Sequence, residues 1–436
     1  MNKRENHTYI WDEKSECMSR KDLHTIQSKS LTTEIQRIYK TVPFYNSKFD
    51  ETNIHPNQIH SIDDLPKLPF TTKSDINAYY PLGMLAKACK EIVRIHASSG
   101  TTRKPTIVAY TQKDIQLWSE MMARAMATAG IRPGTIVQNA FSYGLFTGGL
   151  GFHYGAERIG ATLIPISGGN TQRQLTFLQD LGSKVIVCTP SYALFISEVA
   201  TEQGIDIRHL PITIGIFGAE PWSESMRVAI EVNWGIQAYD IYGLSEVIGP
   251  GVAQECSARN GLHVYEDHFI PEVINPDTGE VLAEGELGEL VITAVTKEAL
   301  PLIRYRTGDL TRLFYEPCSC GRTLTRMDRI AGRIDDMVIV RGVNVFPSQI
   351  EDILLQFDSI TPNYQIVVEP EKRNLDELEI RVEVSESFKK DGCLLNLEKQ
   401  LVDEITSVLG IRVKLKILPP NTIPRSEGKA KRLVNP

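Results

Sequence analysis

The chain has 436 residues, of which 42% are hydrophobic and 23% charged, and its formal net charge is −7 at pH 7. This length predicts two or three domains of an ordinary globular protein, and the acidic balance disfavours a nucleic-acid-binding protein, which usually carries a basic surplus. The sequence lacks a signal-peptide core and a membrane-spanning apolar run, and its seven cysteines are scattered, so we expect a soluble, cytoplasmic protein without a membrane partner or a disulfide framework.

Helical and strand-like patterns alternate over the first half of the chain. LTTEIQRIYKTV at 31–42 has helical periodicity, and the stretch at 71–75 is rich in helix-capping residues. From about 90 to 245, short apolar runs alternate with longer amphipathic segments, which indicates a parallel α/β architecture. The expected strands are EIVRIHA (91–97), ATLIPI (161–166), KVIVCT (184–189), ITIGIF (212–217) and IQAYDIYG (236–243), and the expected helices lie at 114–130, 173–182 and 191–204.

The second half of the chain changes pattern twice. Between about 255 and 332, strand-like alternation and the turn PDTGE at 276–280 predict an antiparallel subdomain, open or closed into a distorted barrel. After residue 334, a strand-helix-strand-strand-helix-strand order predicts a small α+β domain. We therefore expect an α/β protein with an N-terminal domain over 1–333 and a C-terminal α+β domain over 334–436.

Three polar segments accompany the expected strands of the α/β region. HASSGTTRKPT (96–106) gathers glycine, hydroxyl and basic residues suited to phosphate, although it lacks the G-x-x-x-x-G-K-[ST] pattern of a P-loop. Gly218-Ala219-Glu220 and YDIYGLSE (239–246) follow two other runs, and ligands of open α/β sheets bind where strands end. Tyr242 offers a flat ring to a purine, and Glu246 offers an oxygen to Mg²⁺. Each segment, taken singly, also fits an ordinary turn, a packed tyrosine or a solvated acid.

Two later segments complete an ordered set. Asp309 in YRTGDL (305–310) can accept both hydroxyls of a ribose, although Gly-Asp also ends many hairpins, and Lys429 lies in RSEGKAKR (425–432), which alone is typical of a solvated charge run. Together with GRIDDMVIVRGVNVFPSQIE (332–351), these motifs resemble the adenylate-forming superfamily of acyl-CoA synthetases. FSYGLFTGGLGFHYGAE (141–157) and PCSCGR (317–322) are similar to the phenylacetate–CoA ligase family within it.

The resemblance implies a role for each matching residue. Lys429 would contact the acyl carboxylate and the α-phosphate, Glu246 would bind Mg²⁺, and Asp335 would be the hinge of a mobile C-terminal domain. Arg341 and Gly342 would present coenzyme A, and Arg103 stands where relatives usually have glycine. The residues implied for ATP are Ser98, Ser99, Gly100, Thr101, Thr102, Ala219, Glu220, Asp240, Tyr242, Asp309 and Arg333.

The resemblance also implies a reaction. The protein would be an ATP-dependent, AMP-forming ligase that adenylates an aryl or arylacetic acid such as phenylacetate and transfers the acyl group to coenzyme A. One alternative is a transferase that uses the same adenylate chemistry with an acceptor other than coenzyme A. Another is a nucleotide-binding regulatory protein without turnover, which the presence of Glu246, Asp309 and Lys429 disfavours. Homodimers are common among such relatives.

The acid-binding pocket has a less specific signal. FSYGLFTGG (141–149) combines aromatic residues with glycines, so Phe141, Tyr143 and Phe146 are predicted to wall a flat apolar slot. The same aromatic side chains also fit a place in the hydrophobic core.

A possible metal site is separate from these motifs. Cys318 and Cys320 flank one residue before a glycine, and Cys256 and His263 lie upstream in ECSARNGLH. Three thiolates and an imidazole form a tetrahedral zinc set, so we expect a structural Zn²⁺, with His268 as the other candidate nitrogen ligand. Buried free cysteines are the alternative.

Overall fold

The computed structural model describes residues 9–98, 105–368, 374–375, 378–385, 388, 394–411 and 413–434. Contacts divide the chain into two compact units. Unit 1 comprises the residues up to Ser167, Ser183–Val187 and Tyr239–Arg329, and unit 2 comprises Gly168–Gly182, Cys188–Ala238 and the residues from Ile330 onward. Unit 2 thus combines the predicted C-terminal domain with segments from the middle of the chain. The domain boundary at 333 and the hinge at Asp335 stay predictions.

Unit 1 begins with four helices, of which the first, the second and the fourth have a side-chain cap on the first turn. The hydroxyl of Ser19 accepts a hydrogen bond from the backbone N–H of Asp22 at 3.1 Å, and Thr72 and Asp75 form a reciprocal capping box, in the stretch where the sequence predicted a cap. The helices of this part are α1 (Glu13–Glu16), α2 (Arg20–Thr41), α3 (Pro43–Glu51) and α4 (Lys73–Ala78), with 3₁₀ turns at Pro56–Gln58, Ile62–Lys67 and Cys89–Glu91.

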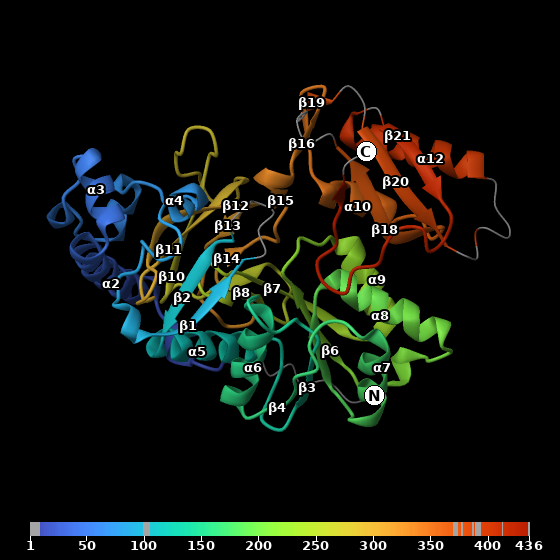
Figure 1. The fold of residues 1–436 in the computed structure, drawn as a ribbon, viewed down its shortest axis with the longest axis horizontal. Helices are drawn as coiled ribbons and strands as arrows, with labels where there is room; N and C mark the ends of the chain where they lie inside the picture. Colours follow the sequence, from blue (N-terminus) through green and yellow to red (C-terminus); the bar gives the residue numbers. More distant parts are fainter. Residues whose placement is uncertain are drawn as a thin grey trace. The chain divides into compact units, whose positions relative to one another are not determined.

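The segment EIVRIHA does not belong to a parallel sheet. It forms β1 (Ile92–Ala97), which pairs antiparallel with β2 (Ile107–Thr111) in a two-stranded sheet (Figure 1). Val93 and Ile95 are exposed, and their neighbours alternate with them in burial. The prediction of a buried parallel strand was wrong here because an apolar run of this length fits either sheet type.

The parallel part of unit 1 contains strands and a helix that the sequence predicted, together with one strand and one helix that it did not. The unpredicted strand β3 (Ile136–Asn139) pairs parallel with both β4 (Thr162–Ile164) and β5 (Val185–Cys188). Helix α5 (Gln112–Thr128) packs on the unpredicted α6 (Gly148–Ile159), where a Cβ on Gly155 would lie 2.7 Å from the Met122 Cβ. The glycines that weaken the helical signal of α6 are therefore the residues that allow this close packing.

The antiparallel region contributes to two sheets. β10 (Phe269–Ile274), β11 (Gly288–Ala294) and β12 (Leu302–Thr311) pair in this order and form the predicted antiparallel layer. Another antiparallel set contains β7 (Gln237–Leu244), β8 (Gly249–Glu255), β9 (Leu262–Val264), β14 (Arg326–Met327) and β13 (Leu313–Phe314), each paired with the next. The second set brings residues near 256, 263 and 318 to one end of unit 1.

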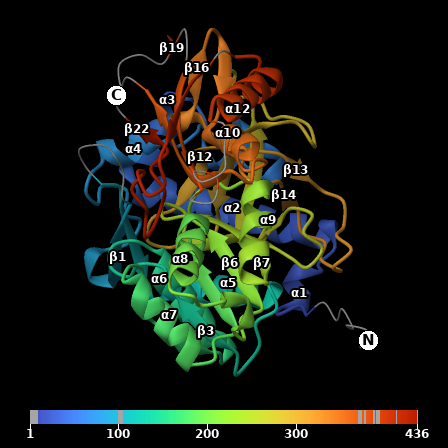
Figure 2. The ribbon, with the colours of Figure 1, turned by 90° about the vertical axis from the view of Figure 1, so that its right-hand side faces the viewer.

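Unit 2 contains the middle helices and the C-terminal α+β part. Helices α7 (Thr171–Asp180) and α8 (Pro190–Glu202) lie side by side (Figure 2), and α8 also packs on α9 (Glu224–Trp234), which follows β6 (Ile214–Gly218). A 3₁₀ turn at Ile207–His209 precedes β6. Among the residues that the structure describes, none of the helices is both long and apolar enough to cross a membrane.

The C-terminal part follows the predicted order of elements. β18 (Ile360–Val367) pairs antiparallel with β20 (Leu378–Val384), which pairs parallel with β21 (Val413–Leu418). α10 (Pro347–Leu354) and α12 (Leu394–Leu409) pack on this sheet through a shared apolar core that includes Ile350 and Leu401. The remaining elements are β15 (Gly332–Arg333), the 3₁₀ turn Ile334–Asp336, β16 (Val338–Val340), β17 (Val343–Val345), β19 (Asn374–Leu375) and β22 (Leu433–Val434).

A buried ion pair provides a test of the packing within unit 1. The guanidinium of Arg304 donates to both carboxylate oxygens of Glu272, at 2.9 and 3.0 Å, and also to the carbonyls of Pro66 and Leu68. Both charged side chains are buried. Glu272→Gln leaves the Arg304 charge buried without its carboxylate, so we expect the free energy of unfolding to fall by about 3 kcal/mol. Urea denaturation measures the change, with Glu280→Gln in an exposed turn as the control; a loss no larger than the control's would contradict the prediction.

Candidate functional site

The predicted phosphate-binding loop lies between the two strands of the β1–β2 hairpin. Ser99, Gly100, Thr101, Thr102 and Arg103 lie outside the described residues. Ser98 is described: its backbone N–H donates to the carbonyl of Thr106 at 2.9 Å, and its hydroxyl accepts from the N–H of Thr106 at 3.3 Å. These bonds fix the base of the loop, and the role of the loop in binding phosphate stays a prediction.

The residues predicted for adenine and ribose in unit 1 contact each other directly. The hydroxyl of Tyr242 donates to the Oδ2 atom of Asp309 at 2.7 Å, and both side chains are buried. Tyr242 comes from β7, and Asp309 lies in β12 directly after Gly308, whose φ of +74° accompanies a register irregularity between β11 and β12. Asp240 lies on β7 as well, with its backbone N–H bonded to the carboxylate of Glu255 at 3.0 Å. Unit 1 thus carries three of the predicted nucleotide-binding residues on two strands of different sheets, β7 and β12, which are joined by the bond between Tyr242 and Asp309.

A buried lysine holds the turn that carries Glu246. The Nζ atom of Lys297 donates to the backbone carbonyl of Glu246 at 3.0 Å and lies 4.7 Å from the ring centroid of Tyr110. Burial lowers the pKa of Lys297 to about 8, although Asp114 and Glu246 oppose the shift. Among the described residues, none donates a hydrogen bond to the Glu246 carboxylate, which leaves its oxygens available to a cation. The sequence patterns did not point to Lys297, because its partner is a backbone atom.

The predicted acid slot places its three aromatic residues differently. Phe141 is buried and stacks on Phe152, with ring centroids 5.2 Å apart, as a core residue does. Tyr143 and Phe146 are half-buried, and the Tyr143 hydroxyl accepts from the amide of Asn139 at 2.8 Å. A Cβ on Gly148 would lie 2.6 Å from the Phe146 ring, so the space left by this glycine is filled by the protein's own side chain. Substrate binding by these residues stays a prediction.

The four predicted zinc ligands come together in unit 1. The ligand atoms of Cys256, His263, Cys318 and Cys320 all lie within 4.8 Å of one another, and all four residues are buried. His268 does not join this group, because its ring nitrogens contact Thr296 at 3.0 Å and Asp267 at 3.2 Å. The geometry therefore favours His263 over His268 as the nitrogen ligand.

In unit 2, the loop that carries Lys429 is bound to the residues after β6. The carboxylate of Glu220 accepts from the backbone N–H of Ser191 and from that of Ala430, both at 2.8 Å. The hydroxyl of Thr189 donates to the carbonyl of Gly428 at 2.9 Å. Ala219 has a φ of +73°, a conformation in which the chain turns sharply after the strand. The predicted adenine-binding turn and the predicted catalytic loop are thus joined within this unit.

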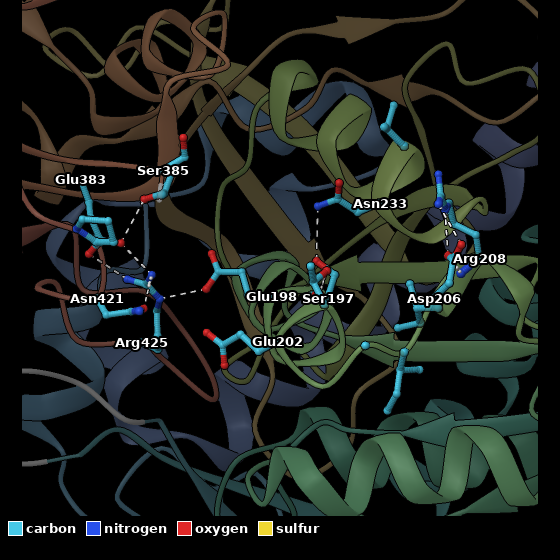
Figure 3. Close-up of a pocket in the computed structure, with 17 residues that line it drawn as sticks. Ser197, Glu198, Glu202, Asp206, Arg208, Asn233, Glu383, Ser385, Asn421 and Arg425 are labelled. Carbon is cyan, nitrogen blue, oxygen red and sulfur yellow. Dashed lines mark hydrogen bonds and ion pairs between the residues drawn. The ribbon is translucent and has the colours of Figure 1, made fainter. Parts of the chain in front are cut away.

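Arg425 adds a second attachment for the same loop. Its guanidinium bonds to Glu198 of α8 at 2.9 Å and to the fully buried Glu383 of β20 at 2.7 Å, as the dashed lines in Figure 3 show. These side chains line a pocket of about 720 Å³ with further acidic residues such as Glu202 and Asp206. Of the described residues that line this pocket, none belongs to the site predicted from the sequence. The contacts of Arg425 instead hold the segment before Lys429 on α8.

The other predicted residues of unit 2 lie between Gly332 and Val345. Arg333 and Asp335 form a loose ion pair at 3.5 Å, and burial raises the pKa of the adjacent Asp336 although Arg333 and Lys429 oppose the shift. Arg341 and Gly342 form the two-residue turn between β16 and β17, with φ of +50° and +84°. Both are exposed, at the end of a hairpin whose turn requires left-handed backbone at both positions.

Comparisons with known proteins agree with this arrangement. Residues 47–296 match the family described as "AMP-binding enzyme", and residues 342–436 match "AMP-binding enzyme C-terminal domain". The chain is 47% identical over 428 residues to a phenylacetate-coenzyme A ligase of Thermus thermophilus, covering 95% of this chain and 96% of that protein. It is 48% identical over 424 residues to the phenylacetate-coenzyme A ligase of Escherichia coli, covering 96% of each. The chain belongs to the phenylacetate–coenzyme A ligase family.

A solved structure supports the same assignment at the level of the fold. The crystal structure of a 2-hydroxyisobutyryl-CoA ligase in the postadenylation state, in complex with 2-HIB-AMP, has a TM-score of 0.93 and 29% sequence identity, and the match covers 100% of this chain and 94% of that one. The resemblance, the mixed α/β fold and the prediction of an enzyme are confirmed. As a member of the phenylacetate–coenzyme A ligase family, the protein is an AMP-forming acid–thiol ligase, a class that uses ATP and coenzyme A.

The buried lysine beside Glu246 makes the stability of this ligase depend on pH. Because the pKa of Lys297 is about 8 rather than 10.5, the folded protein binds this proton less tightly than the unfolded chain does. Below pH 8 the folded state bears the cost of a buried charge. Between pH 8 and 10.5 only the unfolded chain keeps the proton, so stability rises with pH.

The comparison with Lys297→Met isolates this contribution. We expect the free energy of unfolding of the wild type to rise, relative to that of the variant, by about 1.4 kcal/mol for each pH unit crossed in that window. Urea denaturation at several pH values gives the two curves, with the exposed Lys113→Met as the control. Parallel curves for the wild type and Lys297→Met would show that Lys297 does not titrate there.

Proposed function

We propose that the protein converts phenylacetate, or a closely related arylacetic acid, to its coenzyme A thioester while ATP is cleaved to AMP and pyrophosphate. The observation that carries the proposal is the similarity, over nearly the whole chain, to two phenylacetate-coenzyme A ligases. The arrangement of polar residues in each unit supports it. The homodimer implied by the resemblance is part of the proposal, and sedimentation analysis tests it.

The first step joins the acid to the nucleotide. A carboxylate oxygen of the acid attacks the α-phosphorus of ATP, the bond from that phosphorus to the bridging oxygen breaks, and pyrophosphate leaves. Two anions must approach each other, so a cation near the reacting atoms lowers the barrier. We assign this role to Lys429, whose loop is positioned by the hydrogen bonds of Glu220 and Thr189. The hydroxyl-rich loop at 98–102 would bind the β- and γ-phosphates.

The nucleotide would be recognised by groups on β7, β12 and the turn after β6. In this proposal Asp309 accepts hydrogen bonds from the ribose hydroxyls, and its bond from Tyr242 fixes its orientation. Tyr242, Asp240, Ala219 and Glu220 border the adenine. Arg333 is assigned to the ribose or the phosphate, as the resemblance implies.

Magnesium fits the oxygen donor that the structure offers. The buried carboxylate of Glu246 is a hard oxygen ligand, and Lys297 holds its backbone in place. Glu246 would therefore bind the Mg²⁺ of the ATP complex, which neutralises charge on the phosphates when bound. The Zn²⁺ expected from the sequence takes no part in these steps.

The second step transfers the acyl group to sulfur. The thiol of coenzyme A loses its proton and attacks the acyl carbon, the bond from that carbon to the phosphate oxygen breaks, and AMP leaves. We assign presentation of coenzyme A to the exposed turn of Arg341 and Gly342, and the intervening domain movement to a hinge at Asp335. An acceptor other than coenzyme A would use the same first step, and it is the main competing function.

Pyrophosphate and AMP formation test the proposed substrate and acceptor together. We expect pyrophosphate release with ATP and Mg²⁺ to require an arylacetic acid, and sustained AMP formation to require coenzyme A as well. Benzoate, phenylacetate, phenylpropionate and a short aliphatic hydroxy acid form the panel. If pyrophosphate release depends on the acid and AMP formation does not depend on coenzyme A, another acceptor is favoured. If the enzyme prefers the aliphatic hydroxy acid, the proposed binding of an aryl group is excluded.

Replacement of Lys429 separates the two steps. Lys429→Ala should lower acid-dependent pyrophosphate release by about 10²–10³-fold, because it removes a charged donor from the adenylation step. The same variant should convert synthetic phenylacetyl-AMP and coenzyme A to thioester at nearly the wild-type rate. Lys431→Ala, an exposed neighbour in the same tail, is the control. Equal losses of rate in both steps would show that Lys429 is needed for the folded structure and not for the adenylation step in particular.

A further inference from the structure

The antiparallel sheet of unit 1 brings four metal-binding side chains to one end. Cys256 follows β8 directly, and His263 lies in β9, the next strand of the hairpin. β9 also pairs with β14, and the turn that carries Cys318 and Cys320 lies between β13 and β14. The pairing of these strands therefore makes neighbours of residues that are more than 50 positions apart in the sequence.

The distances between the side chains match a tetrahedron around one ion. The Sγ atoms of Cys256 and Cys318 are 3.7 Å apart, and the Sγ atom of Cys320 is 3.4 Å from the Nε2 atom of His263. Zinc binds sulfur at about 2.3 Å and nitrogen at about 2.0–2.1 Å, so tetrahedral angles place two sulfurs about 3.8 Å apart and a sulfur and a nitrogen about 3.6 Å apart. The side chains already stand close to these separations.

We propose that Cys256, His263, Cys318 and Cys320 bind one structural Zn²⁺. All four residues are buried, with exposed fractions from 0% for His263 to 8% for Cys318. The three thiols form a compact group of their own among the buried residues. Soft thiolates with one imidazole select zinc over the hard cation Mg²⁺, and four protein ligands leave no open position for substrate or water.

The surroundings of the cluster supply one of the usual outer contacts of a zinc site. The Nη1 atom of Arg322 donates toward the Sγ atom of Cys320 at 3.7 Å, which offsets the single negative charge that three thiolates and Zn²⁺ leave. The Nδ1 atom of His263 is buried and has no hydrogen-bond partner in the described part of the chain, unlike that of most zinc-bound histidines. The orientation of His263 therefore depends on its place in β9 and on the ion.

Arg322 connects this cluster with the start of the chain. Its fully buried guanidinium forms an ion pair with the equally buried Glu16 of α1, and it donates to Thr128 of α5 at 3.0 Å. The Sγ atom of Cys17 donates to the carbonyl of Gly321 at 3.3 Å. A metal that fixes the turn at 318–322 thus also fixes the site where the N-terminal segment is attached.

Metal analysis of the full-length protein tests the proposal directly. The protein is purified with a thiol reductant, without chelator and without a metal-affinity step, and zinc is measured by mass spectrometry against quantified protein. We expect about one zinc per chain in the wild type and at least a fivefold lower content in Cys318→Ser and Cys320→Ser. Cys17→Ser, which alters a thiol next to the turn, and Cys89→Ser, which alters an exposed one, should both keep the wild-type content.

A second measurement does not depend on the folding of the variants. Wild-type protein produced with Co²⁺ should show the absorption bands of tetrahedral cobalt with thiolate ligands, and added Zn²⁺ should abolish them. Wild-type protein that contains less than a tenth of an equivalent of zinc, even from zinc-supplemented cells, would overturn the proposal. The proposal would also be overturned if the wild-type protein had a mass two hydrogens below that of the reduced chain because Cys256 and Cys318 form a disulfide.

Discussion

The carboxylate of Glu220 holds the loop that carries Lys429, the lysine proposed for the adenylation step. It accepts one hydrogen bond from the first turn of α8 and another from the backbone next to Lys429. Hydrogen bonds that backbone N–H groups donate to a carboxylate are shorter and stronger than those between neutral groups. Because the contact is made to main-chain atoms, it positions the loop while the ammonium group of Lys429 takes no part in it.

The charged side chains near the candidate site residues have different kinds of partner in the two units. In unit 1, two charged groups of the candidate site region bond to a backbone or hydroxyl group, Lys297 to the carbonyl of Glu246 and Asp309 to the hydroxyl of Tyr242. In unit 2, Arg425 is shared between two carboxylates, one on α8 and one on β20. The first arrangement fixes Glu246 and Asp309, the residues proposed for Mg²⁺ and ribose, through bonds to neighbouring elements. The second joins side chains of α8 and β20 to Arg425, and Glu383 also accepts from the backbone N–H groups of Thr422 and Ile423.

Much of the candidate site could be predicted from the sequence because its residues lie in short contiguous motifs. YDIYGLSE, YRTGDL and the cysteine pair at 318 and 320 each carry their chemistry within a few positions. The contacts of Glu220, Lys297 and Arg425 could not be predicted in this way, since each joins distant segments and two of them end on backbone atoms. Helix α6 was missed for a different reason, because its glycines are selected by packing against Met122 and Trp118 rather than by helix propensity.

The attachment of α1 has a consequence for where the chain can be shortened. Residues near the start of a protein are usually regarded as a dispensable tail. Here a deletion that removed Glu16 would leave the guanidinium of Arg322 buried without its carboxylate, at a cost of about 3–5 kcal/mol. The damage would fall on a turn some 300 positions further along. A shortened variant should therefore begin before Tyr9, whose carbonyl also accepts from Arg322.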